Sequence, residues 1–257
     1  MITSTANSKL KLARSLIGRS RDRREAGLFI AEGVRLVEEA MRSGWPFRFV
    51  LVGESSSSRG LELSRELANR HIEVEPVADA LLQSISATET SQGILAVLEQ
   101  SPLPLPGPLD FILIADQVRD PGTLGTLLRT AAAAGVQAVL VPPETTDPFM
   151  PKVGRAGMGA HFRLPILPLA WEEIRARVSG LQVFLAEMEG EISCWEADLK
   201  SPLALIIGGE AEGASAYART LANQQVFIPM VAHTESLNAG IAGAILLFEV
   251  VRQRRDH

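Results

Sequence analysis

Short, uninterrupted apolar segments recur through the second part of this 257-residue chain, and most of them lead into a segment of helical character. A strand that is apolar along its whole length is typical of a parallel sheet covered on both faces. Strands that alternate with helices make such a sheet the core of an α/β fold. We therefore predict an α/β domain with parallel strands at 110–116, 136–142, 181–189, 202–210 and 224–230.

The stretch QSPLPLPGPLD at 100–110 interrupts this pattern. Its four prolines and one glycine exclude a regular helix or strand. We therefore predict a proline-rich linker at 101–109 between a domain at 1–100 and a domain at 110–257. Both parts have an ordinary domain size.

The part before the linker alternates between helix and strand as well. Its apolar patterns predict strands at 28–33, 47–54, 72–77 and 92–100, with helices at 9–18, 34–44 and 60–70. This alternation predicts a second, smaller α/β domain at the N-terminus.

Positive charge is concentrated at the start of the chain, although the formal net charge is −5. Residues 1–24 carry seven lysines and arginines against a single acid, Asp22. Such an arm suggests local contact with phosphates, and Arg14 and Arg24 are our candidates for it. A solvated, frayed terminus explains the same composition equally well.

The composition argues against a disulfide-stabilised, a metal-binding and a membrane-spanning protein. Cys194 is the only cysteine, so no intrachain disulfide can form, and the four histidines lack metal-ligand spacing. We therefore expect no metal site. The apolar run at 237–248 is 12 residues long, which is too short to span a bilayer. We expect a cytoplasmic protein with no membrane partner.

Parallel sheets bind ligands at the carboxyl ends of their strands, and three loops there carry unusual residues. The first, DQVRDPGTLGTLLRTAAAAG at 116–135, begins with Asp116 and continues into a predicted helix that contains Arg129. Arginine is suited to holding a phosphate or a ribose oxygen. A surface arginine paired with a carboxylate remains the alternative for Arg129.

The second and third loops follow the strands at 202–210 and 224–230. The second, LIIGGEAEGAS, places adjacent glycines before Glu210 but lacks the spacing of the dinucleotide fingerprint. An ordinary tight turn is the alternative there. The third, IPMVAHTESLNAGIAGAILLFE, leads into the final helix, for which Ser236 is the predicted cap. Asn238 either shares that role or faces a ligand.

Taken together, the three loops resemble, in order and spacing, the signature motifs of the SpoU (TrmH) family in the SPOUT class. These are AdoMet-dependent RNA ribose 2′-O-methyltransferases. The resemblance covers roughly 110–250, and its motifs are DQVRDPGTLGTLLRTAAAAG, IIGGEAEG and IPMVAHTESLNAGIAGAILLFE. LFIAEGVRLVEEA and SQGILAVL in the first part resemble the family's N-terminal substrate-binding domain.

The resemblance implies a deep C-terminal trefoil knot that holds S-adenosyl-L-methionine, and a homodimer formed through the final helix. It also implies a structured RNA substrate, with 23S-type ribosomal RNA favoured over transfer RNA. The matching cofactor-binding positions are Gly208, Ile228, Met230 and Leu237. The matching catalytic positions are Arg129, Glu210, Ser236 and Asn238.

One position departs from the family pattern. The first motif usually reads D-P-x-N-x-G, and here Thr123 in DPGTLG replaces the asparagine that would help to orient the substrate. Threonine keeps a hydroxyl but loses the paired donor and acceptor of an amide. A non-catalytic RNA-binding relative is therefore the alternative to an active enzyme. The presence of all four catalytic positions argues for activity.

Overall fold

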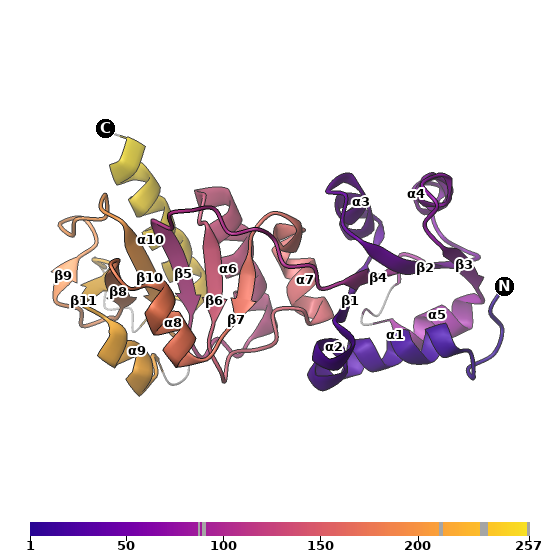
Figure 1. The fold of residues 1–257 in the computed structure, drawn as a ribbon, viewed down its shortest axis with the longest axis horizontal. Helices are drawn as coiled ribbons and strands as arrows, with labels where there is room; N and C mark the ends of the chain where they lie inside the picture. The colour runs from indigo at the N-terminus through magenta and orange to yellow at the C-terminus, as the bar shows by residue number, and fades with distance from the viewer. Residues whose placement is uncertain (87, 89–90, 211–212, 232–235, 256–257) are drawn as a thin grey trace. The chain divides into compact units, whose positions relative to one another are not determined.

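The computed structural model describes residues 1–86, 88, 91–210, 213–231 and 236–255. The chain forms two compact units, which we describe separately. The N-terminal unit contains Met1–Pro102 together with Phe149–Phe162, and the C-terminal unit contains Leu103–Pro148 and Arg163–His257. Figure 1 labels the helices and strands of both units.

The described residues of the N-terminal unit form a four-stranded sheet in the order β1-β4-β2-β3. Its strands are β1 (Leu28–Glu32), β2 (Phe47–Gly53), β3 (Val74–Val77) and β4 (Ile94–Glu99). β4 runs antiparallel to both β1 and β2, whereas β2 and β3 are parallel. The unit is therefore an α/β domain with a mixed sheet.

Helices cover both faces of this sheet (Figure 1). One face carries α1 (Ser8–Gly18), α2 (Ser20–Ala26) and α5 (Asp79–Ile85), and the other carries α3 (Val34–Arg42) and α4 (Ser58–Asn69). Leu10, Ala13 and Leu16 lie on one side of α1 and pack into a core with sheet residues such as Ile30 and Leu51. This three-residue spacing is what fixes the buried face of α1.

A segment from the middle of the sequence joins the N-terminal unit. It contains α7 (Pro151–Gly157) and a 3-10 turn, η1 (Ala160–Phe162), and α7 contacts β1. Arg155 binds the buried carboxylate of Glu32 at 3.1 Å. The segment also completes an aromatic cluster formed by Phe29, Trp45, Phe149, His161 and Phe162.

The described residues of the C-terminal unit form a seven-stranded, wholly parallel sheet in the order β7-β6-β5-β10-β8-β11-β9. The predicted α/β fold with a parallel sheet is confirmed for this unit. Its strands are β5 (Phe111–Ala115), β6 (Ala138–Val141), β7 (Ile166–Pro168), β8 (Gln182–Ala186), β9 (Ile192–Ser193), β10 (Leu203–Ile207) and β11 (Gln224–Phe227).

The two faces of this sheet are covered by different helices. Ile112 and Ile206 pack with residues of α8 (Trp171–Arg177) and α9 (Ala216–Leu221). Ile207 points to the opposite face, because successive residues of a strand alternate between faces. There it meets α10 (Ala239–Arg255), which packs against α6 (Pro121–Ala134).

The close packing of α10 against α6 explains the glycines in α10. A Cβ on Gly240 would lie 3.4 Å from Thr126 Cγ2, and one on Gly243 would collide with the side chain of Leu127. These positions let α10 approach α6 closely. Among the described residues, no helix is long and apolar enough to cross a membrane.

Candidate active site

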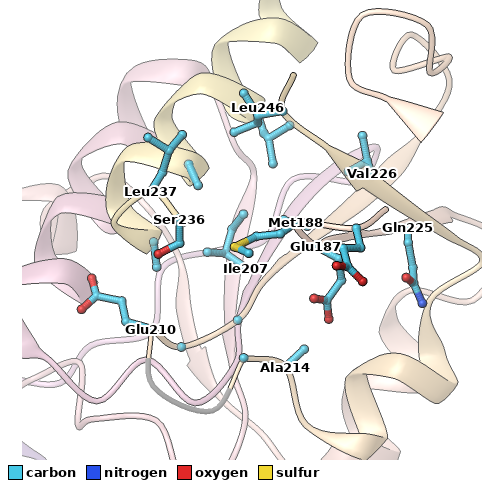
Figure 2. A pocket seen from close by; sticks show the side chains of 18 of the residues that line it. Glu187, Met188, Ile207, Glu210, Ala214, Gln225, Val226, Ser236, Leu237 and Leu246 are labelled. Atoms are coloured by element: carbon cyan, nitrogen blue, oxygen red, sulfur yellow. The ribbon is translucent and has the colours of Figure 1, made fainter. Parts of the chain in front are cut away.

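Three of the parallel strands and the start of α10 enclose a cavity of about 730 Å³ in the C-terminal unit (Figure 2). Strands predicted at 181–189, 202–210 and 224–230 end earlier in the structure, at Ala186, Ile207 and Phe227. The residues beyond each strand leave the sheet and line the cavity instead. The sequence rule for parallel sheets therefore located the cavity correctly.

All four predicted cofactor-binding residues line this cavity: Gly208, Ile228, Met230 and Leu237. Gly208 occupies a position that excludes any side chain. A Cβ there would lie 2.8 Å from Ala214 N and 2.9 Å from Gly213 C. Backbone groups therefore form this wall of the cavity.

Glu210, Ser236 and Asn238, three of the four predicted catalytic residues, also line the cavity. Thr123 Oγ1 donates to Glu210 Oε1 at 3.1 Å, and Asn238 Nδ2 donates to the same oxygen. Asn238 Nδ2 also lies 3.4 Å from Thr123 Oγ1. We call these three residues the polar cluster. Glu210 Oε2 accepts no hydrogen bond from the residues that the structure describes, so one carboxylate oxygen is held and the other remains available.

The start of α6 positions Thr123 in this cluster. Asp120 caps the helix by accepting the Thr123 amide at 2.7 Å through Oδ2, and Pro121 occupies the first turn. The side chain of Thr123 is consequently buried beside the cavity. A hydroxyl at this position, where the family usually has an amide, still reaches Glu210.

The prediction that Ser236 caps the final helix was wrong. The helix begins at Ala239, and Asn238 Oδ1 accepts the Ile241 amide at 3.2 Å. Ser236 lies two residues too early and is exposed at the cavity wall. The Asn238 side chain therefore has two roles, since its oxygen caps α10 and its nitrogen donates a hydrogen bond to Glu210.

Arg129 lies apart from the polar cluster within this chain. It is exposed on α6, and the structure gives it no hydrogen bond or ion pair with a described residue. Helical geometry explains the separation, because six residues rotate the side chain by about 240° relative to Thr123. Thr123 faces the cluster, and Arg129 faces away from it into solvent.

Arg14 and Arg24 lie in the N-terminal unit, and both are exposed. Arg14 Nη2 is 3.4 Å from Ser84 Oγ. Much of the remaining basic arm is engaged within the unit. Lys9 pairs with Glu73 and Glu75 at 2.6 and 2.5 Å, which raises its pKa, and the buried Arg23 donates to the Leu16 carbonyl.

The sequence analysis missed one acidic residue of the C-terminal unit, Glu187, and gave no role to another, Asp116. Glu187 lines the cavity just beyond β8, where it pairs with Arg219 at 2.6 Å. Asp116 follows β5 and is fully buried, and its Oδ2 accepts the Ser215 amide at 2.6 Å. Burial raises the pKa of Asp116 above its ordinary value. Applying the strand-end rule to β8 would have identified Glu187.

Comparison with known proteins decides the family. The model of the SpoU rRNA Methylase family matches residues 110–248, and the model of the MRM3-like substrate binding domain matches residues 7–96. The chain belongs to the SpoU family. The predicted resemblance and the predicted enzyme class, a methyltransferase, are confirmed.

Individual SpoU relatives match almost the whole chain. The 23S rRNA (guanosine(2553)-2′-O)-methyltransferase RlmP of Bacillus subtilis is 32% identical, covering 97% of this chain and 98% of its own. The crystal structure of AviRb from Streptomyces viridochromogenes, in complex with the cofactor AdoMet, has a TM-score of 0.82 at 30% identity and covers 98% and 100%. An AdoMet-bound rRNA methyltransferase from Sinorhizobium meliloti has a TM-score of 0.84 at 30% identity and covers 98% and 97%.

Proposed function

We propose that this protein transfers a methyl group from AdoMet to a ribose 2′-hydroxyl in 23S-type ribosomal RNA. The polar cluster at the wall of the cavity carries this proposal, because it presents a fixed carboxylate where a hydroxyl substrate would meet the cofactor. The relatives from Bacillus and Streptomyces, which are named as 23S ribosomal RNA 2′-O-methyltransferases, support the same substrate. The substrate in turn favours a cytoplasmic location.

The cavity suits AdoMet. Its volume of about 730 Å³ lies within the usual range of ligand pockets, and its lining combines apolar side chains with bare backbone at Gly208. Gly208, Ile228, Met230 and Leu237 would hold the cofactor. When bound, AdoMet supplies a methyl group on a positively charged sulfur.

The polar cluster would orient the attacking hydroxyl. Thr123 and Asn238 fix one oxygen of Glu210, which leaves Oε2 to accept a hydrogen bond from the 2′-hydroxyl. Holding that oxygen in line with the methyl–sulfur bond is the main task, and such positioning is worth about 7–11 kcal/mol. Ser236 lies on the same wall and would contact substrate or cofactor.

Arg129 would act through its charge. An arginine stays protonated in proteins, so it is unsuited to accept the hydroxyl proton. Because Arg129 faces away from the polar cluster of its own chain, we assign it a role across the proposed dimer. There it would stabilise negative charge developing on the ribose oxygen of RNA bound at the partner subunit, and contact the adjacent phosphate. Its exposure and its lack of a partner among the described residues leave the guanidinium available for RNA.

A homodimer formed through α10 is part of the proposal. Ile241, Ile245 and Phe248 are 49%, 39% and 49% exposed, and their spacing puts them on one side of the helix. An exposed apolar stripe of this kind is typical of a protein interface. Because α6 packs against α10, such a dimer would bring the helix that carries Arg129 near the partner subunit.

A trefoil knot and the two-domain division are also proposed. The end of α10 is held against an earlier segment, since Gln253 Oε1 accepts the Leu199 amide at 3.0 Å and Gln253 Nε2 donates to the Ala197 carbonyl at 3.2 Å. A C-terminus anchored in this way is compatible with a knot. The domains proposed are 1–100 and 110–257, with 101–109 as the linker, except that Phe149–Phe162 of the second range pack with the N-terminal unit. Arg14 and Arg24 are the proposed RNA contacts in the first domain.

Transfer of labelled methyl from AdoMet to unmodified RNA tests the proposed function. Total RNA and ribosomal particles are incubated separately, digested with nuclease, and searched for the labelled nucleoside. We expect a ribose-methylated nucleoside from the large ribosomal RNA. A labelled nucleoside in transfer RNA would show that the substrate is transfer RNA and not ribosomal RNA. No transfer, with RNA binding intact, would favour the non-catalytic alternative motivated by Thr123.

A further inference from the structure

A second cavity, of about 420 Å³, lies in the N-terminal unit. All of its lining residues except the first are polar: Val34, Arg35, Ser55, Ser57, Arg59, Ser91 and Gln92. Neither Arg14 nor Arg24, the candidates from the basic arm, is among them. The cavity therefore needs an explanation of its own.

The walls of this cavity are held by hydrogen bonds to the backbone. Gln92 Oε1 accepts the Val34 amide at 2.9 Å, and Ser57 Oγ accepts the Gly60 amide at 3.2 Å. Gly93 has a φ of +74°, and a Cβ on it would lie 2.8 Å from Ser56 Cα. The backbone beneath the cavity is thus closely packed, which preorganises the groups around it.

The lining of the cavity includes two arginines, Arg35 and Arg59, and no acidic residue among those the structure describes. Arg35 is exposed and makes no hydrogen bond or ion pair with a described residue. Arg59 pairs with Glu38, but Glu38 also pairs with Arg42 at 2.6 Å, so one carboxylate serves two guanidinium groups. Asp79 accepts the Ser55 amide at 3.1 Å, which lowers the pKa of Asp79 and directs its carboxylate to that amide.

We propose that this cavity binds a phosphodiester group of the RNA, with Arg35 and Arg59 as its cationic ligands. Guanidinium groups match the oxygens of a phosphate in pairs, and serine hydroxyls and the Gln92 amide add neutral donors. The inference rests on the proposed function. All the lining residues fall within the range 7–96 that matches a substrate-binding domain, which favours RNA over a free anion.

Binding of the full-length protein to an unmodified large-subunit ribosomal RNA transcript tests this site. The double variant Arg35→Gln/Arg59→Gln is compared with Arg48→Gln/Arg70→Gln, which removes two exposed arginines of the same unit that lie outside the cavity. Filter binding is measured between about 50 and 200 mM KCl, because each phosphate contact contributes to the salt dependence. Circular dichroism and AdoMet binding check that both variants fold.

We expect the cavity variant to raise the Kd about tenfold and to reduce the salt slope by about 0.7–0.9, the value for one phosphate contact, whereas the control changes the Kd by less than about twofold. Equal effects of the two variants would overturn the site. An unchanged RNA Kd would also overturn the proposed site. Thermal melts with and without inorganic phosphate then show whether the cavity binds a free anion instead, because the cavity variant would lose any stabilisation that phosphate gives to the unaltered protein. Methyl transfer by the unaltered protein is measured in parallel, so loss of the proposed function is recognised separately.

Discussion

The hydroxyl of Thr123 donates to the carboxylate of Glu210 across 87 positions of sequence, at a distance of 3.1 Å. This contact shows that the threonine, which replaces the usual asparagine of the family, still hydrogen-bonds to Glu210. A hydroxyl supplies one donor to Glu210, and the Asn238 amide supplies a second donor to the same oxygen. The replacement therefore preserves the hold on Glu210.

Thr123→Val tests that hold, because valine keeps the shape of threonine but lacks the hydroxyl. A hydrogen bond to a charged group contributes about 1.5–3 kcal/mol, so we expect methyl transfer to slow by roughly tenfold to a hundredfold. AdoMet affinity should not change, since Thr123 does not line the cavity. Thr123→Ser keeps the donor and is the matched control. Equal rates for the valine and serine variants would contradict the role of the hydroxyl.

Asn238 is predicted to affect stability and catalysis through different atoms. Asn238→Asp keeps an oxygen that can cap α10, but it replaces the donor to Glu210 with a second carboxylate. We expect nearly unchanged thermal stability and a large loss of methyl transfer. Asn238→Ala should also lose transfer and be less stable by about 1 kcal/mol, the usual value of a cap.

Thermal melts and single-turnover rates of the two Asn238 variants separate these effects. An aspartate variant that melts as early as the alanine variant would show that Asn238 does not cap the helix. An aspartate variant with normal rates would show that the contact with Glu210 is unimportant for the reaction.

How much of this site could be read from the sequence depends on the range of the contacts involved. The place of the cavity was predictable, because parallel strands deliver their carboxyl ends to one edge of a sheet. Its lining by Gly208, Ile228 and Leu237 was predicted only from the resemblance to the SpoU motifs. The polar cluster was not, since it depends on contacts over 87 and 115 positions of sequence. Apolar periodicity carries no information on such pairs.

The exact start of a helix is a second feature that the sequence did not determine. Ser236 and Asn238 are both good capping residues, and only the observed start at Ala239 selects Asn238. The membership of Phe149–Phe162 in the N-terminal unit was equally hidden, because it rests on tertiary contacts with β1. The different directions of Thr123 and Arg129, in contrast, follow from helical geometry alone, because six residues place the two side chains about 120° apart around the helix.

Arg129 is expected to matter for catalysis but not for folding. Its guanidinium has no partner among the described residues, so Arg129→Ala should change the free energy of unfolding by less than about 0.5 kcal/mol. Loss of charge stabilisation should lower the single-turnover rate by about 10²–10³. Arg129→Lys keeps the charge without the planar fork and should be intermediate. Arg175→Ala, another exposed arginine of the C-terminal unit, is the control. Near-native rates for Arg129→Ala would exclude a central role.

The apolar stripe on α10 predicts a dimer that a single charge should weaken. Phe248→Asp places a carboxylate on this stripe, where burial in an interface would leave the charge unpaired. We expect light scattering to show a dimer for the unaltered protein and a monomer for the variant at the same concentration. Trp195→Asp changes an aromatic residue that is 62% exposed elsewhere on the unit and should leave the dimer intact. A monomeric unaltered protein would contradict the proposed interface.

Asp116 predicts a specific dependence of stability on pH. Burial raises its pKa in the folded protein above the ordinary 3.8, so the folded state binds the proton more tightly than the unfolded state. Asp116 therefore contributes a stabilisation of the folded state that is fully present below pH 3.8 and is lost as the pH rises through the pKa of the folded protein. Asp116→Asn keeps an oxygen for the Ser215 amide and does not titrate. The melting temperature of Asp116→Asn relative to the unaltered protein should therefore increase between about pH 4 and pH 7. A difference that stays constant over this range would show that the Asp116 pKa is the same in both states.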